Sequence, residues 1–216
     1  MNLVVLGATG RTGRLVVEQA LAAGHSVTAL VRSPEKLTAD NAKLRVVIGG
    51  ATDASALSRA FEGADAIIST LGGGGSVITD STAAIVAAAH KVGVSRVVVL
   101  SSFFVERDRL DAASRLLTGV AMGAMIQDKS AGERELRESD LDWTIVYASV
   151  LGDGPATGSV AVLPEGVKRS VLQKISRADV AAWMVQDATD LRYSRRSVGI
   201  TAEPARECAG AVGSRS

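Results

Sequence analysis

The sequence has very few of the residues that form disulfides and metal sites. Among its 216 residues are one cysteine, Cys208, and two histidines, His25 and His90. A single cysteine cannot form an internal disulfide, which fits the reducing conditions of the cytoplasm. The cysteine and the histidines are far apart in the chain, and a surface or capping role is the simpler interpretation of both histidines. We therefore expect no metal ion and a cytoplasmic location.

The chain also has no long apolar run and almost no net charge. No apolar run approaches the roughly 18 residues that a membrane span needs. The first run, Leu3 to Leu6, has no basic segment before it, so we expect no signal peptide. The formal net charge of +1 gives no reason to expect nucleic acid or an anionic membrane as a partner.

What the sequence does contain is a regular alternation of strand and helix patterns. Strand patterns fall at residues 2–6, 26–31, 44–48, 65–69, 96–100 and 142–147, with a last short one at 197–201. Helix patterns fall at residues 12–23, 53–61, 77–92, 123–139 and 177–187. Asp53 and Ser176 are expected to cap their helices, with Asp179 completing a capping box. Such an alternation predicts a parallel sheet covered by helices on both faces.

A glycine-rich turn joins the first strand to the first helix. Its glycines, Gly7, Gly10 and Gly13, have the spacing G-x-x-G-x-x-G. Gly7 is expected to allow a sharp turn, Gly10 a close approach to a pyrophosphate, and Gly13 close packing of the helix on the strand. This position between a buried strand and a helix N-terminus favours a nucleotide phosphate site over an ordinary turn.

The alternation and the glycine turn together predict the fold class. We expect an α/β fold with a Rossmann-like, doubly wound parallel sheet in three layers. No repeat or linker divides the chain, so we predict one domain over residues 1–203, with a small substrate-side extension toward the C-terminus. Residues 204–216 are predicted to be a flexible tail.

The end of the second strand indicates which dinucleotide is bound. A site that selects NAD usually has Asp or Glu about 20 residues past the glycines. This chain has Arg32 instead. A guanidinium there can bind a 2′-phosphate and stack on adenine. We predict NADPH rather than NADH; the alternative is a solvated surface arginine.

Further candidates follow the next two strands. Asp53 and Ala54 come after the third strand, and Leu71 and a run of four glycines, Gly72 to Gly75, come after the fourth. Four consecutive glycines are costly in chain entropy, which favours a ligand passing close to the backbone over a flexible surface loop.

Lys129 is the most unusual residue of the helix predicted at 123–139. Helical spacing places it on one stripe with Met122, Met125, Ile126, Glu133 and Leu136. This stripe is apolar and faces the sheet, where lysines are uncommon. We favour a functional Lys129, next to Ser101 and Ser102 at the end of the fifth strand, over a solvated Lys129–Glu133 pair.

Two loops are longer than the fold needs. One covers residues 101–122 and the other residues 148–174. Both leave the carboxyl edge of the sheet, where long loops often form lids or substrate walls. A small surface helix is the alternative for the first loop, and the two interpretations are compatible.

These motifs together resemble the NmrA-like, NAD(P)H-binding group of the atypical short-chain dehydrogenase/reductase superfamily. The resemblance covers residues 1 to about 200. It is carried by the glycine turn, Leu30 to Arg32, Asp128-Lys129, Leu136 to Val146, and Ile175 to Ala181. Within the group the chain looks most like the flavin and biliverdin-IXβ reductases, through Ser101 to Phe103 and Gly152 to Pro155. This implies that Ser102 lies near the nicotinamide and that the backbone of Ala148 to Leu151 borders it.

The chain departs from the family pattern at two positions. Catalytic short-chain dehydrogenases use Tyr-x-x-x-Lys, in which the tyrosine supplies a proton. Met125 stands four residues before Lys129. The flavin and biliverdin reductases also carry a histidine in the loop after the sixth strand, and the residue that matches it here is Val150. Reduction of a flavin could tolerate both changes, because the flavin can take its proton from solvent.

Two functional hypotheses follow from the resemblance. The leading one is an NADPH-dependent reductase that passes hydride to a planar conjugated acceptor, such as a flavin, a quinone or a linear tetrapyrrole. The rival is a non-catalytic NADP(H)-binding redox sensor with a protein partner, and an NADP-dependent epimerase ranks last. An open cleft lined by Phe103, Phe104, Met122 and Met125 favours a substrate, and closed packing of the same groups favours the sensor. We expect a monomer or a weak homodimer.

The candidate site is a set of residues from several strand ends. The predicted catalytic residues are Ser102 and Lys129. The predicted cofactor-binding residues are Gly7, Thr9, Gly10, Arg11, Thr12, Gly13, Arg32, Asp53, Ala54, Leu71, Gly72, Ser101, Ala148, Val150 and Leu151.

Overall fold

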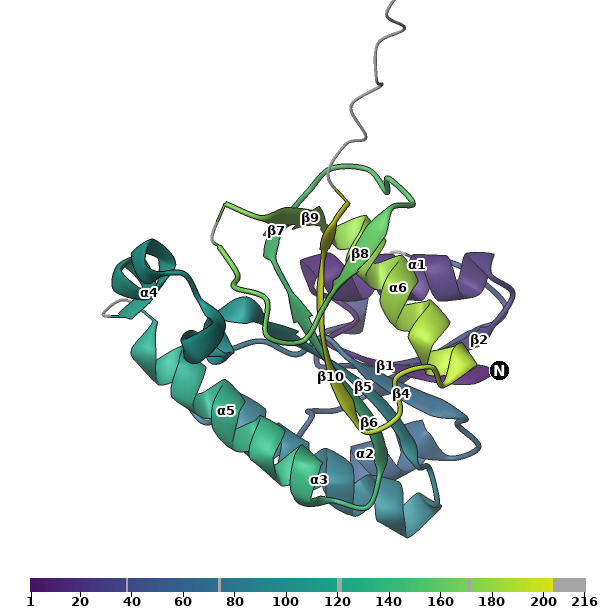
Figure 1. Ribbon diagram of the computed structural model, residues 1–216. Coiled ribbons are helices and arrows are strands. Elements are labelled where there is room, and N and C mark those ends of the chain that lie inside the picture. Colours follow the sequence, from purple (N-terminus) through teal and green to yellow (C-terminus); the bar gives the residue numbers. More distant parts are fainter. Residues whose placement is uncertain (38, 74, 120–121, 171, 204–216) are drawn as a thin grey trace, which may run out of the picture.

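Eight strands form one twisted sheet at the centre of the molecule (Figure 1). The computed structural model describes residues 1–203 except 38, 74, 120–121 and 171. The sheet order is β3-β2-β1-β4-β5-β6-β10-β8. The strands are β1 (Asn2–Leu6), β2 (Ser26–Val31), β3 (Leu44–Ile48), β4 (Ala66–Ser69), β5 (Arg96–Ser102), β6 (Asp142–Ala148), β8 (Val160–Leu163) and β10 (Arg196–Ala202). Neighbouring strands are parallel except for β8, which runs antiparallel to β10 at one edge.

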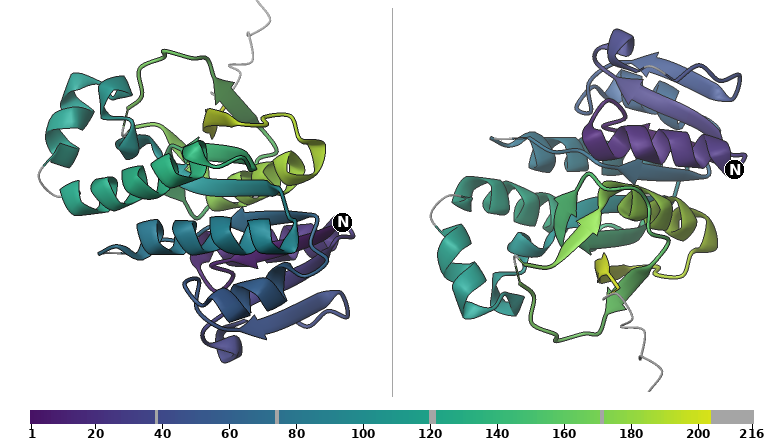
Figure 2. Two further views of the ribbon diagram at one scale, coloured as in Figure 1. Left: turned by 90° about the horizontal axis from the view of Figure 1, so that it is seen from below. Right: turned by 90° about the horizontal axis from the view of Figure 1, so that it is seen from above.

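Helices cover both faces of the sheet, as the alternating pattern predicts. On one face lie α1 (Arg11–Ala22) and α6 (Arg177–Asp190), and on the other lie α2 (Ala54–Phe61), α3 (Val77–Val92) and α5 (Gly123–Glu138). Figure 2 shows α3 and α5 side by side from below, and α1 and α6 from above. The predicted three-layer, doubly wound fold is therefore confirmed, with small shifts at the element ends.

Alternation along the buried strands explains the two core layers. Leu3 and Val5 of β1 pack with α1 and α6, whereas Val4 and Leu6 pack with α2 and α3. All four side chains are at most 1% exposed. Because successive side chains point to opposite faces of a strand, a continuous Val/Leu run serves both layers at once.

The chain reverses its direction across the sheet between β1 and β4. Strands β2 and β3 lie on one side of β1, and the chain then returns to form β4 on the other side. Thr70, just after β4, donates its backbone N–H to Leu6 O at 3.0 Å. The carboxyl ends of β1 and β4 therefore form the topological switch point, where ligands bind in folds of this type.

The predicted helix caps are confirmed. The Asp53 carboxylate accepts hydrogen bonds from the backbone N–H groups of Ser55 and Ala56, at 2.9 and 3.1 Å. Ser176 Oγ accepts from the backbone N–H of Asp179 at 2.9 Å and donates to the Asp179 carboxylate at 2.8 Å. These caps are local interactions, which explains why residue spacing alone could find them.

The prediction of two long loops, at 101–122 and 148–174, is corrected by the structure, because both segments contain regular secondary structure. The first holds two 3-10 turns and α4 (Ala112–Gly119), the small helix that was the alternative. The second holds β7 (Val150–Gly152), which pairs with β9 (Lys174–Ser176), and also β8. These strands have three or four residues. Such lengths are too short for periodicity to reveal. The predicted tail at 204–216, including Cys208, lies outside the described residues.

Candidate functional site

The glycine turn has the geometry predicted for it at two of its three glycines. Gly7 has a φ of +79°, in the left-handed region that favours glycine. A Cβ atom on Gly13 would lie 2.1 Å from the carbonyl oxygen of Gly7. Helix α1 therefore packs directly on the turn after β1, and any side chain at Gly13 would separate them. The expected approach of a pyrophosphate to Gly10 stays a prediction.

Helix α1 begins without a side-chain cap in the described part of the chain. Its N-cap is Gly10, and its first turn contains Arg11 and no acidic residue. By contrast, Asp53 caps α2, Ser176 caps α6, and the Asp128 carboxylate from α5 caps α3. The first N–H groups of α1 therefore have no side-chain acceptor within the described chain, and the helix dipole favours an anion there.

A cleft of about 670 Å³ opens at the switch point. Six of the predicted cofactor-binding residues line it: Gly7, Thr9, Gly10, Arg32, Leu71 and Gly72. Its wall also includes residues that the sequence analysis did not predict, namely Gly49 to Thr52, Thr70, Gly73, Val77, Asp80 and Ser81. Gly49 and Gly50 directly follow a predicted strand, so the sequence held a signal for them.

Arg32 lies at the end of β2 on this wall, with an exposed side chain. No hydrogen bond or ion pair ties its guanidinium to the rest of the described chain. An arginine held in a cleft without a protein partner is available to an anionic ligand. This observation fits the predicted 2′-phosphate contact, which stays a prediction.

Five predicted cofactor-binding residues near the turn and α2 do not line the cleft. The carboxylate of Asp53 is engaged in capping, and Ala54 is the exposed first residue of α2. Thr12 and Gly13 are buried within α1. Arg11 forms an ion pair with Asp153, which also pairs with Arg177 at the start of α6. The structure does not place these five on the cleft wall, and their cofactor contacts stay predictions.

A second, small cavity adjoins the cleft beneath α5. It has a volume of about 10 Å³, roughly the room that one water needs. Leu71 and Ser81 line both spaces, and Ser101 and Lys129 line the small one. The predicted orientation of Lys129 toward the sheet is therefore confirmed. Burial lowers the pKa of the Lys129 ammonium, while the carboxylates of Glu133 and Asp128 oppose this shift.

Glu133 is a buried carboxylate rather than half of a solvated surface pair. It is 4% exposed. Its Oε1 accepts a hydrogen bond from Ser101 Oγ at 2.5 Å. Its Oε2 accepts from the Tyr147 hydroxyl and from Arg137 Nη2, the latter at 3.1 Å. A buried carboxylate needs such donors. Because two of them come from the ends of β5 and β6, the network ties α5 to these strands.

The remaining candidates gather where β5 and β6 end. Ser101 lies beside Tyr147, and Ser102 beside Ala148, in the parallel register of these strands. Ser102 Oγ accepts a long bond of 3.5 Å from Phe104 N. Val150 and Leu151 follow in β7. Between them and β6 is Ser149, whose Oγ is buried without a hydrogen-bond partner in the described chain. Such an orphaned hydroxyl is one observation that fits a bound ligand at this edge.

Four aromatic and methionine side chains were expected to distinguish a substrate site from a sensor, and the structure buries one of them. Phe103 is 2% exposed, and the Arg169 guanidinium lies 4.6 Å from its ring centroid. Phe104, Met122 and Met125 remain half-buried. The packing therefore leaves both functional hypotheses in place.

Acid is expected to loosen the contact between α3 and α5 through Asp128. Burial alone would raise the pKa of this carboxyl, but hydrogen bonds from Thr79 and Ile78 bring the pKa below its usual value. A lowered folded-state pKa stabilises the fold above the unfolded pKa of about 3.9, and this contribution is lost as the pH falls further. The free energy of unfolding of Asp128→Asn should therefore depend less on pH between about 5 and 2 than that of the wild type.

Denaturant titrations at several pH values measure this dependence. Asp40→Asn changes an exposed aspartate and is the matched control. An Asp128→Asn variant with the wild-type pH dependence would contradict the assignment.

These features define a dinucleotide-binding protein of the Rossmann type, with an uncapped α1, a glycine turn and a cleft at the switch point. A family model for NAD(P)H-binding proteins matches residues 7–190, and the chain belongs to that family.

Known proteins similar to this chain include reductases. The (4-alkanoyl-5-oxo-2,5-dihydrofuran-3-yl)methyl phosphate reductase of Streptomyces griseus is 29% identical over 209 residues, 92% of this chain and 67% of that protein. The solved structure of ChuY, an anaerobillin reductase from Escherichia coli O157:H7, has a TM-score of 0.80 at 26% identity and covers 95% of this chain and 100% of that one. A short-chain dehydrogenase/reductase from Veillonella parvula, in complex with NADP, has a TM-score of 0.83 at 21% identity, with 94% and 95% covered.

None of the helices in the described ranges has the length and apolar character needed to cross a membrane.

Proposed function

We propose that this protein is an NADPH-dependent reductase that passes hydride to a planar conjugated acceptor, such as a flavin. The proposal is supported by the position of the candidate cofactor-binding and catalytic residues on two neighbouring spaces. The glycine turn and Arg32 line one cleft, and Leu71 lines both this cleft and the small cavity of Ser101 and Lys129. A charged, elongated cofactor with a reactive end would lie along this cleft, from the phosphate cradle toward these polar groups.

The residues divide into two groups along this path. The N–H groups of α1 and the glycine turn would hold the pyrophosphate, and Arg32 the 2′-phosphate. Ser101, Ser102 and Lys129 would orient the nicotinamide end, next to the backbone of Ala148 to Leu151. When bound, the cofactor supplies hydride, and the protein's part is to hold two rings together and keep their geometry.

The proton requirement of the reaction favours a flavin-like acceptor. Met125 occupies the position four residues before Lys129, so that position has no phenol to act as an acid. The Tyr147 hydroxyl is buried and bound to Glu133, and burial followed by the nearby Glu133 charge raises its pKa. A reduced flavin can take its proton from solvent, whereas a ketone needs an acid in the site.

The relatives support a reductase of conjugated substrates. One is named for reduction of a phosphorylated dihydrofuran and another for reduction of anaerobillin. A quinone or a linear tetrapyrrole therefore remains within the proposed substrate class. We also propose a single domain over residues 1–203, a monomer or weak homodimer, and a cytoplasmic location.

The non-catalytic sensor is the second candidate, favoured by the closed packing of Phe103 under Arg169. A sensor would bind NADP(H) and a protein partner without turnover. The deciding experiment incubates purified protein with NADPH and FMN and follows NADPH absorbance. Oxidation clearly above the free-flavin background supports the reductase, and no excess with FMN, quinone or tetrapyrrole leaves the sensor.

Cofactor choice is expected to depend on Arg32. The variant Arg32→Asp should weaken NADPH binding by roughly 10- to 100-fold, because a charge-assisted contact is replaced by repulsion. NADH affinity should stay the same or improve, since a carboxylate there can accept from ribose hydroxyls. Fluorescence titration of both cofactors measures this.

Arg134→Asp makes the same charge change on the exposed side of α5 and is the matched control. Equal losses in the two variants would mean that only overall charge matters. Unchanged NADPH binding in Arg32→Asp would rule out the 2′-phosphate role.

A further inference from the structure

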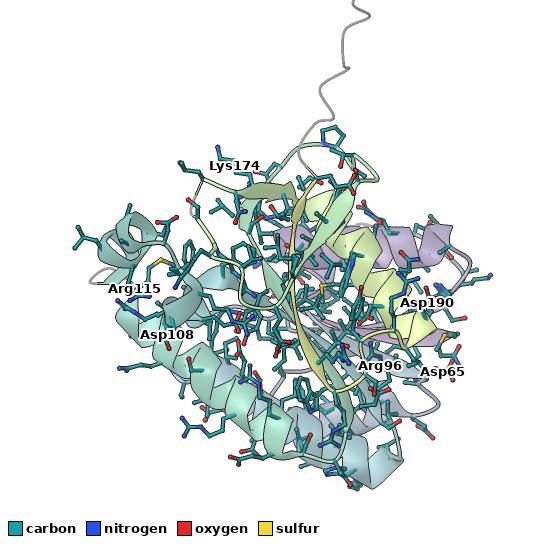
Figure 3. The ribbon with its side chains drawn as sticks, viewed as in Figure 1. Asp65, Arg96, Asp108, Arg115, Lys174 and Asp190 are labelled. Carbon is teal, nitrogen blue, oxygen red and sulfur yellow. The ribbon has the colours of Figure 1, made fainter. Side chains whose placement is uncertain are left out.

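A groove of about 740 Å³ lies where the two segments beyond the carboxyl edge meet. Its apolar lining comes from Leu110, Ala112 and Leu116. Its polar lining comes from Arg107, Asp111, Arg115 and Lys168. This volume is within the range of small-molecule sites in proteins. Figure 3 shows Arg115 and Asp108 together at the α4 side of the molecule, near the start of α5.

The cations of the groove exceed its carboxylates. Lys168 Nζ and Arg115 Nη2 both donate to the backbone carbonyl of Asp108, at 2.8 and 3.2 Å. No carboxylate within the described ranges forms an ion pair with Arg107, Arg115 or Lys168. Asp111 is the one acid on the wall, and it accepts a hydrogen bond from Ser114 N at 2.7 Å.

Neighbouring acids do not cancel this excess. Glu106, a half-buried carboxylate in the same segment, is paired with Arg169 and Arg109. Asp108 is exposed and contributes its carbonyl oxygen. The groove therefore combines an apolar floor with a positive rim, which favours a ligand that is both apolar and anionic.

The groove is coupled to the end of the sheet where the candidate site lies. Asp111 N donates to Arg169 O at 2.9 Å, and Arg169 N donates to Arg109 O at 2.7 Å. Leu110 is 1% exposed and shares a core cluster with Phe103 and Tyr147. Tyr147 is the register partner of Ser101. The two segments that line the groove are therefore bonded to each other and packed on the ends of β5 and β6.

We propose that this groove binds the anionic group of an acidic, amphipathic acceptor, a carboxylate or a phosphate attached to a planar apolar body. This inference rests on the proposed reductase function and narrows its substrate class from conjugated acceptors to conjugated anions. The two arginines supply planar donors that suit either anion, and the leucines pack on the carbon skeleton next to it.

The test compares acceptors that differ only in the anion. The probes are FMN with riboflavin for the phosphate, and biliverdin with its dimethyl ester for the carboxylates. Equilibrium binding is measured by fluorescence quenching in the presence of NADP, so that no turnover is needed. We expect the wild type to bind at least one anionic probe about 10- to 100-fold more tightly than its neutral partner, and added salt to weaken only the anionic one.

The double variant Arg115→Gln, Lys168→Gln should reduce this preference to about 3-fold or less, with the affinity of the neutral probe unchanged. The control is Arg134→Gln, Lys91→Gln, which removes two exposed cations elsewhere. Thermal melting confirms that each variant is folded, and the salt dependence of the wild type gives an answer independent of the variants.

Three outcomes would overturn the proposal: equal binding of each pair by the wild type, an unchanged preference in the double variant, or no binding of any probe. These outcomes are distinct from failure of the reductase function, which is the absence of NADPH oxidation. A protein that binds FMN selectively but never oxidises NADPH would keep the groove and lose the reductase.

Discussion

Gly13→Ala is expected to abolish measurable NAD(P)H binding and to destabilise the fold. The added Cβ would lie 2.1 Å from Gly7 O and 2.7 Å from Gly7 C, which are both backbone atoms. Backbone cannot rotate away as a side chain can, so α1 or the turn after β1 must move. We expect a loss of at least about 3 kcal/mol in the free energy of unfolding. We also expect NADPH binding to weaken by more than about 100-fold, because the turn and the first N–H groups of α1 move together.

Gly123→Ala is the matched control for this substitution. Gly123 also lies in the first turn of a helix, and a Cβ there would meet nothing within 4 Å. Its stability should stay within about 1 kcal/mol of the wild type. Denaturant titration and fluorescence binding of NADPH measure both variants. Near-normal cofactor binding by Gly13→Ala would mean that the turn does not hold the pyrophosphate.

Glu133→Leu is expected to have the second large effect, through the network at the ends of β5 and β6. The leucine cannot accept hydrogen bonds from Ser101, Tyr147 and Arg137, which would lose their shared partner inside the protein. Breaking a buried charged network from one side costs about 3–5 kcal/mol. We therefore expect a loss of that size in the free energy of unfolding, measured by denaturant titration.

Two further variants distinguish the loss of the hydrogen-bond network from the mere loss of a negative charge. Glu138→Leu changes an exposed residue of the same helix and should stay within about 0.5 kcal/mol of the wild type. Adding Tyr147→Phe to Glu133→Leu should cost less than the sum of the single changes, because the stranded hydroxyl is removed. Additive losses, or a stable Glu133→Leu, would show that the network contributes little.

Local signals explain how much of the fold could be predicted. The strands and helices, the caps at Asp53 and Ser176, and the close packing of Gly13 depend on neighbours within a few residues. They could therefore be found from spacing alone. The same reasoning gave α4 only as an alternative and missed β8, because short elements are stabilised by distant partners, as β8 is by β10.

The candidate site could be predicted only in part from the sequence, for the same reason. Glycines and Arg32 at strand ends were found because strand ends can be located in the sequence. Glu133 was considered as a surface partner of Lys129, since helical spacing cannot tell which polar residue on a stripe is buried. The joining of Leu110 and Asp111 to Arg169 had no sequence signal, because about 60 residues separate them.

The sequence by itself determined the order of strands and helices along the chain, the glycine-rich turn after β1 and the arginine at the end of β2. Each of these depends on a short stretch of chain and on backbone preferences that the stretch carries with it. Only the tertiary structure decided that Gly49, Thr70 and Arg32 share one cleft, that Glu133 is buried, and that a positive groove forms between two distant segments. Those outcomes depend on which strands are neighbours in the sheet, and that order results from packing across the whole core.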